Sequence, residues 1–334
     1  MINIEPPSSF PNSALFSPCL TRTLTRACLA TLLATCIPGH AQSSLKQWQL
    51  VWSDEFNASN GSSPDSSKWN IVTGGKGFGN NELETYTSRP INAHQQDGNL
   101  VITAQKEDIT GPDGIPRHYT SARINTQHHF AQKYGRFEAR IKLPTGKGIW
   151  PAFWLLGDDH ETSPWPSCGE IDILETIGAP DTMYSTIHGP GYSGSKGLST
   201  KYVLPAGEAV NNAFHLYAVE WTPNDLKFFL DDHLIVERTP ADLPPDTKWV
   251  YDHPFYILLN LAVGGNWPGS PDDSTTFPQQ MLVDYVRVYS RNSEAATNPG
   301  ASFIDSDVGA SSEGRPLSSI SQGSYTSATE QAQP

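Results

Sequence analysis

The sequence Trp-Pro-Ser-Cys-Gly-Glu-Ile-Asp-Ile-Leu-Glu-Thr-Ile-Gly, residues 165–178, decides the fold because it sets three acids inside an apolar run. Its β-branched residues and flanking glycines favour a strand over a helix, on which the first and last acids would point well apart. On a strand, Glu170 and Asp172 share one face, while Ile171 and Ile173 share the other and can face a core. The stretch therefore predicts a strand with one apolar and one acidic face.

The third acid, Glu175, breaks this alternation. Strict alternation would place Glu175 on the apolar face, where an unpaired buried carboxylate is costly. A β-bulge at residues 173–174 would add one residue and return Glu175 to the acidic face. The Glu170 and Glu175 carboxylates could then lean to the ~5–5.5 Å separation of a retaining glycosidase pair. A solvated acidic strand face is the alternative, although three adjacent acids repel one another.

Length and composition set limits on the class of protein. A chain of 334 residues allows one large β domain or two ordinary domains. The net charge is −13 and basic residues are not clustered, so a nucleic-acid partner is not expected. The nine Trp and twelve Tyr residues suit a sugar-stacking surface as well as a core. This composition is compatible with a neutral polysaccharide substrate.

Residues 1–41 have the features of an export signal. Arg22 and Arg26 precede an apolar run at residues 27–37, and Gly-His-Ala offers a cleavage site before Gln42. The apolar run is too short to span a membrane as a helix. The sequence therefore predicts a secreted or periplasmic protein without a stable membrane anchor.

The positions of the cysteines are consistent with removal of residues 1–41. Three of the four lie within it, and lipidation at Cys36 is a weaker alternative because Thr35 is a poor residue before a lipidated cysteine. Cys168 alone would remain, so a large core rather than disulfides must hold the exported chain together. Cys168 could line the cleft, but a small buried apolar side chain is the favoured interpretation.

Between the signal and residue 292, short apolar or alternating segments separated by turn residues predict strands. They are residues 50–56, 100–104, 119–126, 135–142, 214–221, 226–236, 255–263 and 283–289. Asp231-Asp232 predicts a hairpin turn within 226–236, and the uniformly apolar 255–263 predicts a central strand. No sustained helical period is present, which favours a β-sandwich. Residues 293–334 are poor in large apolar residues, which predicts a disordered tail.

The pattern Glu-Ile-Asp-Ile-x-Glu, preceded by Trp-Pro and Gly, closely resembles glycoside hydrolase family sixteen, with the bulged spacing of its laminarinase-like β-glucanases. The resemblance covers roughly residues 47–290 and implies a catalytic domain at 42–292. The implied fold is an all-β jelly-roll sandwich of two curved antiparallel sheets with a concave cleft. The resemblance makes Glu170 the nucleophile, Asp172 its supporting acid and Glu175 the acid/base.

Further residues match sugar-binding positions of the family. Trp150 and Trp154 match its Trp-Pro-Ala-x-Trp pattern and would form stacking floors, although aromatics at this spacing are more often core residues. The other matched residues are Arg123, Asn80 and Asn81 near the subsites before the cut bond, His188 near the acid/base, and Trp267 on the cleft wall. The asparagines and Trp267 are equally well explained as ordinary loop residues.

The same resemblance implies a structural calcium ion on the convex side. Its expected ligands are Glu55, the Gly98 carbonyl and Asp284, and such oxygen ligands suit a hard cation. The alternative is that both acids are ordinary strand-end residues. No cofactor is expected for catalysis.

These patterns predict a secreted, monomeric endo-β-1,3-glucanase that hydrolyses laminarin-type β-glucan with retention of the anomeric configuration. One alternative is an enzyme for mixed-linkage glucan or a galactan, or a transglycosylase. Another is a non-catalytic β-glucan-binding protein, but such relatives typically lack the catalytic glutamates, and both are present here.

Overall fold

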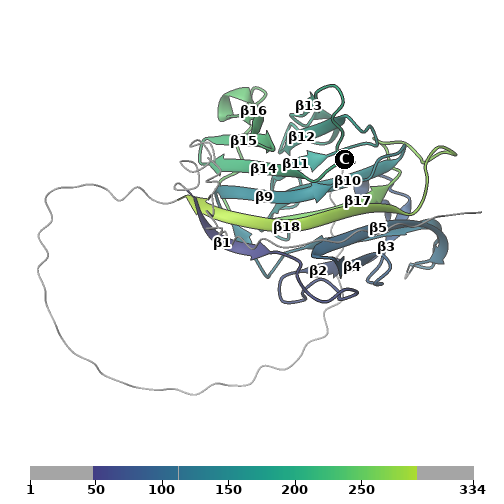
Figure 1. The fold of residues 1–334 in the computed structure, drawn as a ribbon. Helices are drawn as coiled ribbons and strands as arrows, with labels where there is room; N and C mark the ends of the chain where they lie inside the picture. Colours follow the sequence, from purple (N-terminus) through teal and green to yellow (C-terminus); the bar gives the residue numbers. More distant parts are fainter. Residues whose placement is uncertain (1–47, 112, 292–334) are drawn as a thin grey trace, which may run out of the picture.

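Two sheets pack face to face to form a β-sandwich (Figure 1). The structure, a computed structural model, describes residues 48–111 and 113–291. Within these ranges it contains strands and three short 3₁₀ turns but no α-helix. The 3₁₀ turns are η2 (Gly77–Gly79), η3 (Gly194–Lys196) and η4 (Pro240–Asp242). The all-β class predicted from the sequence is confirmed.

The first sheet has ten strands. They are β1 (Trp48–Asp54), β3 (Glu84–Tyr86), β4 (Ala93–Gln96), β5 (Asn99–Thr110), β6 (Pro116–Ser121), β9 (Gly135–Lys142), β14 (His215–Thr222), β15 (Asp225–Leu230), β16 (His233–Arg238) and β18 (Gln279–Arg291). Their order is β16-β15-β14-β9-β18-β5-β6-β3, with β1 beside β18 and β4 beside β5. All pairs are antiparallel except β3 with β6, which is parallel.

The second sheet has eight strands. They are β2 (Asn70–Val72), β7 (Arg123–Asn125), β8 (Ala131–Gln132), β10 (Ile149–Gly157), β11 (Glu170–Glu175), β12 (Thr182–His188), β13 (Thr200–Val203) and β17 (Phe255–Val263). Their order is β13-β12-β11-β10-β17-β7-β2, with β8 beside β17. The acidic strand β11 and the apolar strand β17 both lie inside this sheet. The predicted central position of residues 255–263 is therefore confirmed.

The core fills the space between the two sheets. Strand β9 supplies alternate residues to it, including Phe137 and Ile141, as the sequence pattern predicted. Phe153 of β10 and Ile171 of β11 face them from the second sheet, and both are fully buried. Each buried aliphatic or aromatic side chain of this kind stabilises the fold by about 1.5–3 kcal/mol. The sequence expectation that a large core replaces disulfides is consistent with this packing.

The prediction that residues 119–126 form one continuous strand was wrong. Residues 119–126 do not form a single strand, because β6 lies in the first sheet and β7 in the second. The chain changes sheets at Ala122, which is fully buried and whose carbonyl accepts a hydrogen bond from the Leu261 N–H (3.3 Å). Strands that switch sheets in this way join the corners of a sandwich. The hairpin turn predicted at residues 231–232 is confirmed, since it joins β15 to β16.

Cys168 is fully buried against Trp154, Leu156 and Tyr256 on the face of the second sheet that points away from the main core. Burial raises the pKa of its thiol to about 12, so the reactive thiolate is disfavoured. Cys168 is therefore a small packing residue, as the favoured interpretation held.

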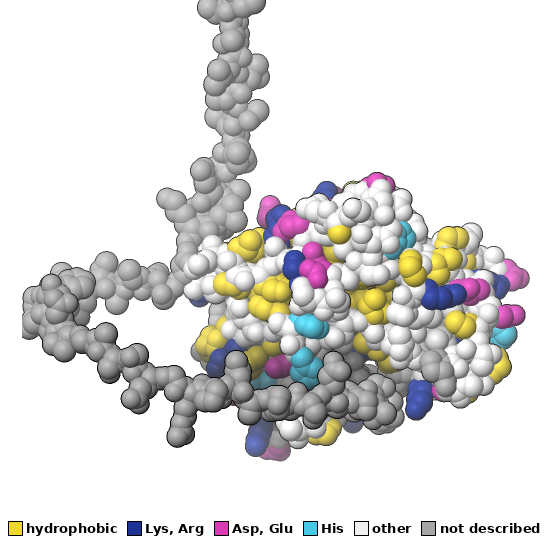
Figure 2. All heavy atoms as spheres, turned by 90° about the horizontal axis from the view of Figure 1, so that it is seen from below, with side chains coloured by type: hydrophobic (Ala, Val, Ile, Leu, Met, Phe, Trp, Pro, Cys, Tyr) yellow, Lys and Arg dark blue, Asp and Glu magenta, His cyan; other side chains and the backbone are white. Residues whose placement is uncertain are grey.

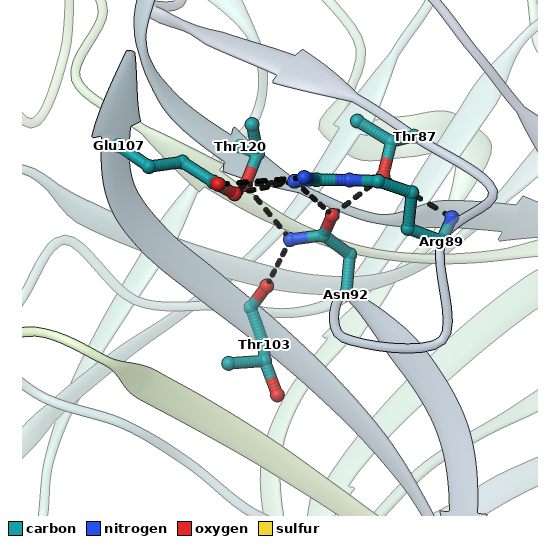
Figure 3. Close-up of polar contacts among 6 residues, drawn as sticks. All are labelled: Thr87, Arg89, Asn92, Thr103, Glu107 and Thr120. Carbon is teal, nitrogen blue, oxygen red and sulfur yellow. Dashed lines mark hydrogen bonds and ion pairs between the residues drawn. The ribbon is translucent and has the colours of Figure 1, made fainter. Parts of the chain in front are cut away.

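A polar network anchors the connection between β3 and β4 (Figure 3). The Arg89 guanidinium forms an ion pair with Glu107 and donates hydrogen bonds to Asn92 and Thr120. The Asn92 side-chain amide in turn donates to Thr120 and to the Thr103 carbonyl, both at 3.0 Å. These contacts tie the residues after β3 to strands β5 and β6. The position of β3, which borders the candidate site, is thereby held.

The predicted signal segment, 1–41, and the predicted tail, 293–334, lie outside the described residues. Among the residues that are described, none belongs to a helix long and apolar enough to cross a bilayer. Figure 2 shows one face of the sandwich, on which acidic and basic side chains are interspersed rather than gathered into a single charged patch.

Candidate active site

The register of the second sheet aligns polar side chains in rows across its concave face. In one row, Arg123 lies opposite Asn260, and Ala152 lies opposite both Asn260 and Glu175. Tyr184 of β12 continues this row beside Glu175. Residues directly opposite one another on neighbouring strands project from the same face of a sheet. The row therefore runs at right angles to the strands, which is the direction of a cleft.

Two further rows carry the other acids. Asp172 lies opposite Trp154 on one side and Thr186 on the other. Glu170 lies opposite His188 of β12. The three rows together place Glu170, Asp172 and Glu175 side by side on one face.

A β-bulge makes this arrangement possible. Asp172 and Glu175 are three residues apart on β11, but their partners on β12, Thr186 and Tyr184, are only two apart. The extra residue allows both Ile173 and Leu174 to be buried in the core, with exposures of 1% and 0%. The bulge predicted at residues 173–174 is confirmed.

The acids open into a narrow cavity in the concave face. Strands β7, β10, β11 and β17 and the segment before β3 form its walls. The lining residues are Phe78, Asn80, Glu82, Arg123, Trp150, Ala152, Trp154, Glu170, Asp172, Glu175 and Asn260.

Indole N–H groups hold the two outer acids. The Trp165 Nε1–H donates a hydrogen bond to Glu170 Oε2, and the Trp150 Nε1–H donates to Glu175 Oε1 at 2.9 Å. Each tryptophan thus fixes one carboxyl group without supplying a positive charge. Trp165 comes from the loop before β11, whereas Trp150 comes from the neighbouring strand β10.

The pKa values of the inner acids are shifted by their surroundings. Burial raises the pKa of Glu175 well above its usual range, and the nearby Asp172 charge raises it further. His188 and the Trp150 hydrogen bond oppose this shift but do not reverse it. Burial, followed by the charge of Glu170, likewise raises the pKa of Asp172. Glu175 therefore keeps its proton at a pH where an exposed glutamate would be ionised, as a general acid requires.

A hydrogen-bonded chain lies on the Arg123 side of these acids. The Trp154 Nε1–H donates to Asn260 Oδ1 (2.7 Å), the Asn260 amide donates to the Tyr86 hydroxyl (3.2 Å), and that hydroxyl donates to Glu82 Oε2 (3.1 Å). The Arg123 guanidinium lies 4.8 Å from the Trp154 ring centroid. This side of the cavity presents both donors and acceptors, which suits recognition of sugar hydroxyls.

The similarity of this chain to known proteins is consistent with a glycoside hydrolase active site. The family described as "Glycosyl hydrolases family 16" matches residues 80–287, which is more than half of the chain. The chain belongs to glycosyl hydrolase family 16. Members of this family are glycoside hydrolases, so the predicted enzyme class and family are confirmed.

Individual relatives of this family 16 hydrolase cover most of its described part. A β-glucanase of Rhodothermus marinus is 42% identical over 252 residues, which are 72% of this chain and 85% of the relative. The glucan endo-1,3-β-glucosidase A1 of Niallia circulans is 38% identical over 258 residues, but this chain spans only 37% of that relative's length. An endo-β-1,3-glucanase structure from Pyrococcus furiosus is 46% identical with a TM-score of 0.71, covering 74% of this chain and 96% of that one. The predicted jelly-roll sandwich is confirmed by this structural match.

The structure separates two neighbouring asparagines of the family 16 hydrolase. Asn80 lines the cavity, whereas Asn81 is exposed and donates a hydrogen bond to Asn266 (2.9 Å). Asn81 has a φ of 55°, which turns its side chain toward the loop that carries Trp267. Of the two asparagines predicted to bind sugar, Asn80 therefore lines the cavity and Asn81 does not, because sequence alone does not reveal a left-handed residue in this loop.

The tryptophans predicted as stacking floors have different surroundings. Trp154 is only 6% exposed and packs beneath Arg123, so little of its ring is open to a sugar. Trp150 is more exposed, and its ring meets that of Trp267 edge-on at 5.6 Å. Trp267 is 40% exposed and also contacts Tyr184 at 4.8 Å. Trp150, Tyr184 and Trp267 thus form an aromatic cluster beside Glu175.

His188 lies beside Asp172 rather than directly beside the acid/base candidate. Its Nε2 is 3.1 Å from Asp172 Oδ2, and its register partner is Glu170. The register of β12 explains this placement, since Tyr184 and not His188 is opposite Glu175.

The predicted calcium ligands have other partners. Glu55 forms two hydrogen bonds with Arg287, at 2.9 and 2.7 Å, and the Asp284 carboxylate pairs with Arg140 at 2.6 Å. Arginine guanidinium groups thus already pair with both carboxylates, which disfavours a calcium ion at these residues. The ion enters no step below.

Several cavity residues were not identified from the sequence. They are Phe78, Glu82 and Asn260, and the sequence also did not identify Tyr86 and Trp165, which hydrogen-bond to lining residues. A signal existed for Asn260, because it is the one polar side chain in the apolar run 255–263. Glu82 and Tyr86 follow the two asparagines in sequence, but nothing in their spacing shows that they turn into the same cavity as Arg123.

Proposed function

We propose that this family 16 hydrolase is an endo-β-1,3-glucanase that hydrolyses laminarin-type β-glucans with retention of the anomeric configuration. The observation that carries the proposal is the bulge in β11, which sets Glu170 and Glu175 on one face with Asp172 between them. The β-1,3-glucan preference is supported by the names of the relatives from Niallia circulans and Pyrococcus furiosus.

In the proposed first step, Glu175 donates its proton to the oxygen of the scissile bond while Glu170 attacks the anomeric carbon. The carbon–oxygen bond to the leaving sugar breaks, and a covalent bond forms between the anomeric carbon and a Glu170 oxygen. The raised pKa of Glu175 supports its role as the proton donor. The leaving sugar departs with the proton as a new hydroxyl group.

In the second step, Glu175 is ionised and acts as a base. It removes a proton from a water molecule, whose oxygen attacks the anomeric carbon and releases the Glu170 carboxylate. Two displacements at the same carbon restore the starting configuration. Glu175 is protonated again at the end of the cycle, so no group is consumed.

Trp165 and Asp172 would position the nucleophile. The Trp165 N–H binds one oxygen of Glu170, which leaves the other oxygen to attack. Asp172 is 3% exposed and lies between the two glutamates, where its charge raises the pKa of Glu175. A nucleophile held in this way loses little orientational freedom during the reaction.

Substrate would lie along the row that runs from Arg123 to Tyr184. The family pattern places Arg123 before the cut bond, so Asn80, Glu82 and Asn260 would bind sugars on that side. The aromatic cluster of Trp150, Tyr184 and Trp267 would then contact the leaving sugars, whose apolar faces stack on aromatic rings.

The proposal also includes export, supported by the signal features of residues 1–41, and a monomeric chain.

Release of reducing ends from a panel of polysaccharides tests the proposal. The panel contains laminarin, mixed-linkage β-1,3-1,4-glucan, an agar-type galactan and keratan sulfate, and products are sized to separate internal from terminal cleavage. We expect laminarin to give the highest rate, with a ladder of oligosaccharides. A preference for a galactan would overturn the substrate, and binding of laminarin without cleavage would overturn the activity.

A further inference from the structure

Glu170, Asp172 and His188 form a compact set of metal-ligating groups. One ligand atom from each lies within 4.8 Å of the others, and within the described ranges no other group of three or more His, Cys, Asp or Glu residues is this compact. The proposed hydrolytic mechanism uses Glu170 and Asp172 without a metal and gives His188 no step. Their chemistry nevertheless matches a known type of metal site, in which three protein ligands leave one position open.

We propose that Glu170, Asp172 and His188 bind a single Zn²⁺ or similar late first-row divalent ion, and that the bound ion inhibits the enzyme by occupying the nucleophile. The metal-binding part depends only on the geometry of the three side chains. The inhibition part rests on the proposed function of Glu170.

The distances are compatible with one ion. Zinc binds imidazole nitrogen and carboxylate oxygen at about 2.0–2.2 Å, so two ligands at a tetrahedral ion lie about 3.3 Å apart. His188 Nε2 and Asp172 Oδ2 are already 3.1 Å apart. Since all three ligand atoms lie within 4.8 Å, Glu170 would have to move its oxygen by at most about 1.5 Å. Rotation of the Glu170 carboxylate can supply this movement, and the Trp165 N–H binds one of its two oxygens.

The site also contains polar atoms without hydrogen-bond partners. The contact between His188 Nε2 and Asp172 Oδ2 lacks hydrogen-bond geometry, so Asp172 Oδ2 is a buried oxygen with no donor. Buried polar atoms of this kind are rare and costly in native proteins. Asp172 is 3% exposed, and a cation bound between it and His188 would satisfy this oxygen.

The charges favour a divalent cation. Two neighbouring carboxylates repel each other in a buried site, and a dication cancels both charges at once. Any proton held by the carboxyl pair leaves when the metal binds. Glu175 stays outside the set because the Trp150 N–H binds it on the far side of Asp172.

The ligand types determine which ion is expected. Imidazole with carboxylates suits zinc, copper, nickel and cobalt, whereas calcium and magnesium prefer six or more oxygen ligands. Calcium and magnesium should therefore bind here at least about a hundredfold more weakly than zinc. A preference for zinc over calcium therefore distinguishes binding at this site from non-specific binding of cations to an acidic protein.

The test uses the full mature chain without a histidine tag. Zinc and calcium binding are measured by isothermal titration calorimetry for the unmodified enzyme and for His188→Asn, Glu170→Gln and His118→Asn. His118 is a matched control, because its Nδ1 lies 2.7 Å from Asp108 but both side chains are exposed and belong to no compact set. Circular dichroism confirms that each variant is folded. Visible absorption of bound Co²⁺ is recorded for Glu175→Gln with and without a laminarin oligosaccharide, since this variant keeps all three ligands but cannot turn over.

We expect one zinc ion per chain, at least about tenfold weaker binding in folded His188→Asn and Glu170→Gln, and unchanged binding in His118→Asn. The oligosaccharide should displace Co²⁺ from Glu175→Gln, and zinc should inhibit hydrolysis competitively. Equal zinc affinity in the unmodified enzyme and His188→Asn would overturn the site, as would no binding at millimolar zinc. Zinc binding that requires His188 in a protein with no glucanase activity would keep the site and overturn the proposed function instead.

Discussion

The hydrogen bond from Trp150 to Glu175 offers a direct test of the acid/base assignment. In Trp150→Phe, the N–H that binds Glu175 Oε1 at 2.9 Å is removed while most of the ring is kept. This bond lowers the pKa of Glu175, against the larger effect of burial that raises it. Without the bond, the ionised form of Glu175 loses a donor and its pKa rises further.

The size of the effect follows from the strength of such bonds. A hydrogen bond to a charged group contributes about 1.5–3 kcal/mol, and about 1.4 kcal/mol corresponds to a tenfold change in an equilibrium constant. The acid dissociation constant of Glu175 should therefore fall about ten- to a hundredfold in Trp150→Phe. Because a general acid works only while protonated, the basic limb of the kcat/KM profile should move to higher pH.

The assay is the pH dependence of kcat/KM on laminarin, with Trp154→Phe as the matched control. Trp154 is a tryptophan of the same strand that lines the same cavity, but its N–H binds Asn260 instead of Glu175. Loss of the Trp154 N–H in Trp154→Phe should lower the rate of hydrolysis without moving the basic limb of the kcat/KM profile. A basic limb that stays in place in Trp150→Phe, or moves to lower pH, would refute the role of Glu175 as the proton donor.

Three further outcomes are expected. Glu170→Gln and Glu175→Gln should each lower kcat by at least about a hundredfold while their Tm does not fall. Glu170→Gln removes one charge from the acidic cluster, and Glu175→Gln replaces a protonated carboxyl group with a neutral amide of the same size. Turnover near that of the unmodified enzyme in either variant would contradict the assignment. Proton NMR in the first minutes of hydrolysis should show the β-anomer, because the proposed mechanism makes two displacements at the anomeric carbon, and an initial α-anomer would indicate inversion instead. Dialysis against EDTA should leave Tm unchanged because Glu55 and Asp284 are paired with arginines; a rise in Tm on adding millimolar calcium would show that the ion displaces them.

The sequence predicted the catalytic strand well because local rules govern it. Alternation with period two assigns Ile171 to the core and Asp172 to the cleft, and the cost of burying an unpaired carboxylate requires the bulge before Glu175. Both features need only the chemistry of neighbouring residues. The same reasoning holds for strand β9, whose predicted bounds are those of the structure.

The pairing of distant segments lay beyond these local rules. Residues 119–126 have the pattern of one strand, yet the chain changes sheets at Ala122, because the curvature of the sandwich and not local propensity requires a corner there. The sequence could not separate Asn80, which lines the cavity, from Asn81 for a similar reason. Which of two adjacent side chains points into a cleft depends on a single left-handed φ angle.

By itself, then, the sequence determined the all-β class, the acidic strand with its bulge, and the identity of the three acids, since each follows from periodicity and from the cost of burying charge. Only the tertiary structure decided what surrounds those acids. Trp165 comes from the loop before the acidic strand, and Asn260 comes from another strand. Glu82 lies nearly a hundred residues before the acids in sequence. The hydrogen bonds of all three depend on the register between strands. Register is a cooperative property of the whole sheet, because every cross-strand pair contributes a little to it and no single pair specifies it.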